Sequence, residues 1–118
     1  MDLASRRCRL TGAGAFEGVF RIGRRSEGEF LQLVSAPAAR PCGRVGFVIG
    51  SKTLPRAVDR NRVRRMLRVV LRDARPVLEG LDVIVRVKRA VPRSQFVLIV
   101  GEARRMFAAL PPRGGSSP

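Results

Sequence analysis

The stretch RAVDRNRVRRMLRVVLR, residues 56–72, decides the fold and also indicates the function. It contains seven arginines, and five of them recur at every fourth position, namely Arg56, Arg60, Arg64, Arg68 and Arg72. Apolar residues in and just after the stretch follow the i, i+3, i+4, i+7 spacing of a helix face, at Val63, Met66, Leu67, Val70, Leu71 and Ala74. At roughly 100° per residue, these side chains occupy an arc of about 140°. We therefore predict a helix that buries one face and carries fixed positive charge on the other.

The positive face of this predicted helix has few acidic residues to neutralise it. Asp59 and Asp73 are its only acids, and like charges at i, i+4 destabilise a helix. A polyanionic partner would remove that repulsion, so we interpret the segment as an RNA-binding helix. One alternative is a solvated charged face. Another is a helix lying on anionic lipid, which is disfavoured because the apolar stripe is needed for the core.

Overall composition supports a nucleic-acid partner for a single domain. The 118 residues include 24 Lys and Arg against 9 Asp and Glu, a net charge of +15 and a pI near 11.9. The chain has no His, which excludes histidine-based triads and zinc sites. Cys8 and Cys42 are too few for a zinc site, so no metal-site residue is predicted. We expect both to be free thiols; a disulfide between them is the alternative, which a cytosolic location disfavours. No membrane span or signal peptide is expected, and we predict a cytoplasmic protein.

The rest of the chain predicts an alternation of helices and strands. A helix is expected after Thr11, with Phe16, Val19 and Phe20 on one face, followed by a polar turn or short edge strand over 21–28. FLQLVS (30–35) and RVGFVIG (44–50) are expected to form an antiparallel pair. LDVIVRVK (81–88) alternates as a half-buried strand does, with Asp82, Arg86 and Lys88 on its polar side.

The remaining predictions concern where the arginine-rich helix ends and where a last helix begins. Pro76 should end the arginine-rich helix near Ala74, and Asp59 lies where the helix dipole favours a carboxylate. Ser94 is a candidate N-cap for a last helix that runs to Leu110, although residues 96–100 (FVLIV) fit a strand equally well by propensity. The order α-β-β-(β)-α-β-α predicts an α+β fold, a two-layer sandwich with a mixed sheet. Residues 1–9 are expected to be a flexible basic N-terminus, 10–110 one RNA-binding domain, and 111–118 a disordered tail.

Other residues could extend an RNA surface or belong to the ordinary fold. Ser51, Lys52 and Arg56 precede the helix and could bind phosphate, or form a simple polar loop. Four phenylalanines could stack on unpaired bases or pack in the core: Phe16, Phe20, Phe30 and Phe47. The acidic residues are scattered along the sequence, whereas a two-metal nuclease needs convergent carboxylates. The chain alone is therefore not expected to cleave RNA.

Several of these segments together carry a family resemblance. They are Arg9-Leu10-Thr11, Phe16-x-x-x-Phe20, RVGF at 44–47, AVDRNRVRR at 57–65, and the strand at 81–88. Over nearly its whole length the chain resembles the protein subunit of bacterial ribonuclease P. The resemblance implies a sandwich like the second domain of ribosomal protein S5, with a left-handed crossover around the Arg-Asn-Arg helix.

The resemblance also implies a function and a set of site residues. The enzyme would mature the 5′ end of precursor tRNA, with a catalytic RNA and its Mg²⁺ performing the hydrolysis and one protein bound to one RNA. Contacts to RNA are implied for Arg60, Asn61, Arg62, Arg64, Arg65 and Arg68, which Lys52 and Arg56 would extend. A cleft for the single-stranded 5′ leader is implied at Phe16, Phe20, Leu33, Phe47 and Ser51.

This chain departs from the family pattern at two of those positions. Leu33 stands where the cleft usually has an aromatic residue, and Ser51 replaces one of two lysines that usually precede the helix. Both changes predict weaker leader binding. The alternative function is a structural ribosomal or ribosome-assembly RNA-binding protein, which the composition fits equally well.

Overall fold

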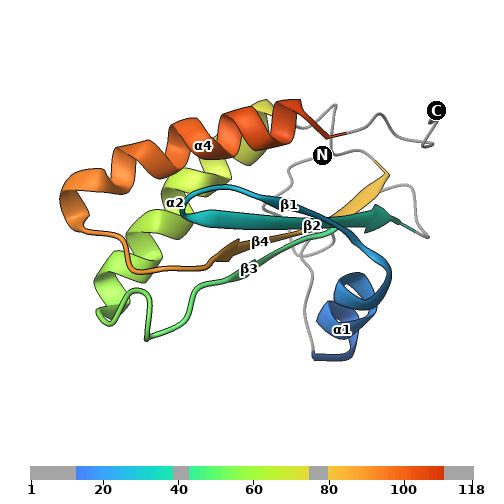
Figure 1. Ribbon diagram of the computed structural model, residues 1–118, viewed down its shortest axis with the longest axis horizontal. Coiled ribbons are helices and arrows are strands. Elements are labelled where there is room, and N and C mark those ends of the chain that lie inside the picture. Colours follow the sequence, from blue (N-terminus) through green and yellow to red (C-terminus); the bar gives the residue numbers. More distant parts are fainter. Residues whose placement is uncertain (1–12, 39–42, 75–79, 111–118) are drawn as a thin grey trace.

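The structure is a computed structural model that describes residues 13–38, 43–74 and 80–110. Its elements in chain order are α1 (Ala13–Ile22), β1 (Arg24–Glu27), β2 (Leu31–Pro37), β3 (Val45–Val48), α2 (Ala57–Asp73), β4 (Leu81–Val87), η2 (Arg93–Gln95) and α4 (Phe96–Ala108). The strands form one mixed sheet in the order β1-β2-β4-β3 (Figure 1). Thr11, the predicted basic N-terminus (1–9) and the predicted tail (111–118) lie outside the described residues.

The arginine-rich helix forms where its sequence pattern predicts. α2 is 17 residues long and ends at the C-cap Ala74, as expected from Pro76. Its buried apolar residues are those of the predicted stripe: Val63, Leu67, Val70 and Leu71. Met66 and Ala74 are partly buried against the same core. The 3.6-residue period of the sequence therefore fixes which face of α2 enters the core.

α2 and α4 cover one face of the sheet and enclose the main core (Figure 1). Alternate residues of the strands point from the sheet into this core: Leu31, Leu33, Val45, Val83, Val85 and Val87. α4 contributes Phe96, Ile99, Ala103 and Phe107. This helical layer on a mixed sheet confirms the predicted α+β sandwich. It also confirms that the apolar run at 96–100 is helical.

α1 packs on the opposite face of the sheet (Figure 1). Val19 of α1 joins a second apolar cluster with Val34, Ala36 and Ile84 of the sheet. β4 is consequently covered on both faces, and Asp82 and Ile84 are buried there. The prediction of a half-buried strand at 81–88 is wrong for this reason.

The predicted antiparallel pairing of residues 30–35 with 44–50 is also wrong. β4 lies between these two strands, antiparallel to β2 and parallel to β3. β4 suits the central position because one of its faces is wholly apolar and Ile84 on its other face is buried against α1, so that only Arg86 of its seven residues is exposed. β3 and β4 are thus parallel neighbours joined through α2, which is a crossover connection. The short polar segment β1 is an edge strand, as predicted.

The start of α4 differs from the predicted capping by Ser94. Ser94 lies within the 3₁₀ turn η2, and the N-cap of α4 is Gln95, which makes no side-chain capping hydrogen bond. The turn moves the α-helix start two residues beyond Ser94. A serine before an apolar periodic run therefore predicted the helix correctly but misplaced its first residue.

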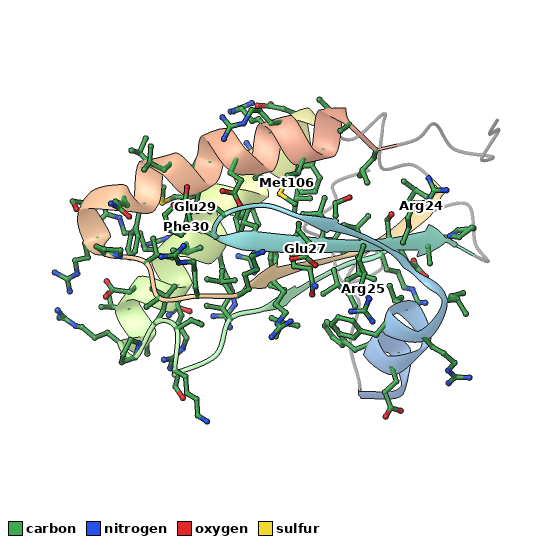
Figure 2. All side chains as sticks on the ribbon, viewed as in Figure 1. Arg24, Arg25, Glu27, Glu29, Phe30 and Met106 are labelled. Atoms are coloured by element: carbon green, nitrogen blue, oxygen red, sulfur yellow. The ribbon has the colours of Figure 1, made fainter. Side chains whose placement is uncertain are left out.

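A buried carboxylate joins α4 to the β1–β2 hairpin. Glu102 accepts backbone N–H hydrogen bonds from Phe30 (2.9 Å) and Leu31 (2.7 Å). A Cβ on Gly28 would collide with the Glu102 carboxylate and approach the Met106 sulfur, so glycine is required for this close approach. Figure 2 shows Glu29 and Phe30 at this turn, with Met106 reaching towards it from α4.

We predict that Glu102→Ala lowers the free energy of unfolding by about 1–3 kcal/mol, because two buried N–H groups lose their acceptor. Urea denaturation monitored by circular dichroism measures this loss. The control is Glu102→Gln, which keeps one acceptor oxygen and should lose less. A change in Glu102→Ala of under about 0.5 kcal/mol, as is usual for surface substitutions, would contradict the assignment.

Candidate nucleic-acid interface

The outward arc of α2 presents cations that the protein itself does not neutralise. Arg62, Arg65 and Arg72 are exposed, while Arg64 and Arg68 are half-buried. Within residues 13–38, 43–74 and 80–110, no arginine of α2 forms an ion pair with a carboxylate. The surface therefore carries fixed positive charge available to an anionic partner.

The two acids of α2 pair instead with the 3₁₀ turn η2 and with α4. Asp59 accepts from Nε of Arg93 at 3.1 Å, and Asp73 accepts from Nη1 of Arg104 at 3.0 Å. Asp59 is in the first turn of α2, as predicted, but it is also buried. Its pairing with Arg93 was not predicted. The signal was present in the sequence, because Asp59 stands four residues before Val63 and so lies on the apolar arc.

Arg60 makes hydrogen bonds within the protein. Its Nη1 donates to the backbone carbonyl oxygens of Leu54 (2.7 Å) and Pro55 (2.9 Å), and the side chain is half-buried. Arg60 thus fastens the loop after β3 to the first turns of α2. The sequence pattern predicts only an RNA contact for Arg60.

Asn61 and Arg62 have distinct neighbours at the surface. The Asn61 side-chain oxygen accepts from Nη1 of Arg64 at 3.1 Å, which leaves its amide N–H groups for other acceptors. The Arg62 guanidinium lies 5.9 Å from the ring centroid of Phe96, at the start of α4. Arg62 therefore lies on the side of α2 that faces α4.

The loop before α2 extends the cationic surface. Ser51 and Lys52 are exposed in the turn after β3, and Arg56 is exposed at the N-cap of α2. The structure thus places the eight predicted RNA contacts on one continuous segment, with the outward residues of α2 following the exposed loop. They are Lys52, Arg56, Arg60, Asn61, Arg62, Arg64, Arg65 and Arg68.

The five predicted leader-cleft residues are not brought together. Phe16 and Phe20 lie on α1 and pack against the cluster on its side of the sheet. Leu33 is fully buried in the core beneath α2 and α4, and Phe47 packs against that same core. Ser51 is in the exposed turn after β3.

The error at Leu33 is one of strand register. Successive side chains of a strand point to opposite faces, so the neighbouring residue Val34 is the one that faces α1. A shift of one residue moves a side chain to the other side of the sheet. Leu33 and Phe47 therefore lie on the opposite face of the sheet from Phe16 and Phe20 and cannot line one cleft with them.

Arg25 adds a cation beside the aromatic pair of α1. Its guanidinium lies 5.5 Å from the Phe20 ring centroid, and its Nη2 donates to the Phe20 carbonyl oxygen at 3.0 Å. Figure 2 shows Arg25 on the α1 side of the sheet and Arg24 on the other side. Sequence reasoning missed Arg25, because only strand alternation in β1 places it there.

The acids on the α1 face of the sheet are paired. Lys88 and Gln32 donate to Glu27, and the Lys88 hydrogen bond is the main cause of the lowered pKa of the Glu27 carboxyl. Arg44 donates from both its backbone and its side chain to buried Asp82, which raises the pKa of the Arg44 guanidinium. Each of these two acids is therefore engaged with a cation of the sheet, and the nearby charge of Arg25 also helps to lower the pKa of Glu27.

A groove of about 650 Å³ lies beside the first turn of α2. Its walls include Leu54, Pro55, Asp59, Arg89 and Arg93, and none of the predicted leader-cleft residues lines it. The described part of the chain contains no group of three or more His, Cys, Asp or Glu that could hold a metal ion. None of its described helices is both long and apolar enough to cross a membrane.

Comparison with known proteins assigns the family. Residues 4–110 match the family model for ribonuclease P. The ribonuclease P protein component of Chromobacterium violaceum is 34% identical over 102 residues, which cover 86% of this chain and 84% of that protein. The same component from Nitrosomonas europaea is 30% identical over 102 residues, covering 86% of each chain.

Solved structures share the fold at lower sequence identity. A Staphylococcus aureus RNase P protein mutant with defective mRNA degradation activity has a TM-score of 0.79 and 17% identity, and the match covers 91% of both chains. The Thermotoga maritima RNase P protein has a TM-score of 0.71 and 19% identity, covering 86% of this chain and 96% of that one. With the match to the family model and the curated relatives, the arginine-rich helix and its sheet show that this chain belongs to the ribonuclease P protein family.

Proposed function

We propose that this chain, a protein subunit of ribonuclease P, docks on the catalytic RNA through the outward arc of α2 and the loop at residues 51–56. The complex, with one protein per RNA, removes the 5′ leader of precursor tRNA in the cytoplasm. The RNA subunit and its Mg²⁺ carry the hydrolysis, and we assign no Mg²⁺ ligand to this chain. The observation that carries the proposal is the absence of carboxylate partners for the α2 arginines within the described residues.

The geometry of α2 suits phosphate binding. Its apolar stripe is buried against the sheet, so the helix presents its guanidinium groups from a fixed backbone. Arginine donates two parallel hydrogen bonds to phosphate oxygens. Each phosphate that is neutralised releases counterions from the RNA, which favours binding and makes it sensitive to salt.

We assign the leader contact to the α1 side of the sheet. Phe16 and Phe20 are half-buried there, and Arg25 lies over the Phe20 ring. Unpaired bases stack on aromatic rings and on guanidinium planes. Leu33 and Phe47 are removed from this proposal because they pack against the opposite core.

The proposed function leads first to a prediction about the division of labour between protein and RNA. Purified catalytic RNA with this chain should cleave precursor tRNA at near-physiological Mg²⁺, and the chain without RNA should not, because it has no convergent acids among its described residues. Gel analysis of the 5′-labelled precursor measures the cleavage. Cleavage by the protein alone would contradict RNA-borne chemistry, and an unchanged rate on adding the protein would favour the ribosomal alternative.

A second prediction concerns the salt dependence of RNA binding. Replacing Arg62 and Arg65 together by Ala should lower the slope of log K against log salt, since each lost phosphate contact removes roughly 0.7–0.9. Filter binding to the catalytic RNA over a range of KCl concentrations measures it. The matched control is Arg105→Ala, an exposed arginine of α4. An unchanged slope in the double variant would show that these arginines are only solvated.

A third prediction separates Arg60 from the other arginines. Arg60→Ala should lower the free energy of unfolding by about 0.5–1.5 kcal/mol for each lost hydrogen bond, because Leu54 and Pro55 lose their donor. The Arg62 and Arg65 variant should not change stability in this way, since both side chains are exposed. Thermal and urea unfolding measure the difference. Equal stability of Arg60→Ala and the wild type would rule out the fastening role.

A further inference from the structure

Exposed valines gather where α2 meets α4. Among the described residues, the large apolar side chains most exposed on the helical layer are Val58 (56%), Val69 (47%), Val97 (67%) and Leu98 (52%). Single exposed apolar residues need no explanation. Three of these four, however, fall on the sides of α2 and α4 that face each other.

Two contacts define those sides. Arg62 lies over the Phe96 ring, and Asp73 pairs with Arg104. Residues four or seven apart share one side of a helix. Val69 is seven residues after Arg62 and four before Asp73, and Val58 is four before Arg62. Val97 is seven residues before Arg104, so it lies on the side of α4 that faces α2.

We call this surface the valine seam: Val58, Val69 and Val97. Leu98 does not belong to it, because it lies roughly 100° further round α4. An exposed valine also lowers helix propensity relative to alanine. The free protein therefore gains nothing from valine at these positions that would favour it over alanine.

The charges around the valine seam indicate its partner. Arg62 and Arg65, which form no ion pair within the described residues, flank it on α2. The nearby acids are already paired, since Asp73 binds Arg104 and buried Asp59 binds Arg93. An apolar centre with a cationic rim complements a polyanion that also offers apolar surface. RNA does so, because its wide, shallow minor groove exposes riboses and base edges between phosphates.

We propose that the valine seam packs against riboses and base edges of the catalytic RNA and supplies a part of the binding that does not depend on salt. This inference rests on the proposed function of α2 as the RNA-docking helix. The arginines bind the phosphates on either side, and the valines exclude water between them. Affinity and salt dependence then have separate structural sources.

The test compares two sets of variants for binding to the catalytic RNA over a range of KCl concentrations. Val58→Ala, Val69→Ala and Val97→Ala are combined in one variant, which is expected to fold because alanine is the better helix former. We expect roughly tenfold weaker binding, from the lost methyl groups, with the slope of log K against log salt unchanged. The Arg62→Ala and Arg65→Ala variant should instead lower that slope. Circular dichroism confirms that the helices form.

Leu98→Ala is the matched control, since it also truncates an exposed apolar side chain of the helical layer, and it should bind as the wild type does. Wild-type affinity in the triple valine variant, with a lowered slope in the arginine variant, would overturn this inference and leave the proposed function intact. The seam would then face a protein partner. A lowered slope in the valine variant would also overturn it, because the valines would be acting through the arginines. No change in either variant would overturn both proposals.

Discussion

The burial of one stripe of α2 against the sheet is the constraint on which the rest of the structure depends. Val63, Leu67 and Val70 are almost completely buried, and burying each such side chain contributes about 1.5–3 kcal/mol. A rotation of α2 by one residue position would move arginines into the core, where unpaired charge is very costly. The apolar stripe therefore sets the orientation of every guanidinium group on the opposite arc.

Three buried acidic residues stabilise this arrangement through ion pairs and hydrogen bonds within the fold. Asp59, Asp82 and Glu102 are buried, and their partners are Arg93, Arg44 and the hairpin backbone. Buried carboxylates need such partners. Within the described residues no carboxylate pairs with an arginine of α2, so the positive charge of that helix stays at the surface. The same pairs join α2 to the turn η2, the residue before β3 to β4, and α4 to the β1–β2 hairpin, so they shape the surface that we assign to RNA.

The sequence predicts those parts of the structure that depend on residues close together in the chain better than the parts that depend on distant segments. α2 and α4 follow from the spacing of apolar residues within one segment, and both were predicted. The two strands that pair with β4 were not predicted correctly, because strand order depends on contacts between segments that are distant in the sequence. The predictions for Asp82 and Leu33 failed for a related reason. Alternation along a strand defines two faces of the sheet, but it does not show that α1 covers one of them. The role of Glu102 could not be predicted from its local sequence. Its carboxylate accepts from backbone N–H groups of the β1–β2 turn, which lie beside α4 only in the folded protein. The predicted RNA contacts form one segment because most of them lie on one helix, whereas the predicted leader cleft combined residues from α1, β2, β3 and the turn after β3.

The most direct test of the central claim is arginine footprinting of the complex. Phenylglyoxal modifies accessible guanidinium groups, and mass spectrometry measures the rate at each arginine with and without the catalytic RNA. We expect the RNA to protect Arg62, Arg65 and Arg68 on α2 strongly, while Arg105 on α4 reacts at the same rate in both states. Equal rates at the α2 arginines with and without RNA would contradict it.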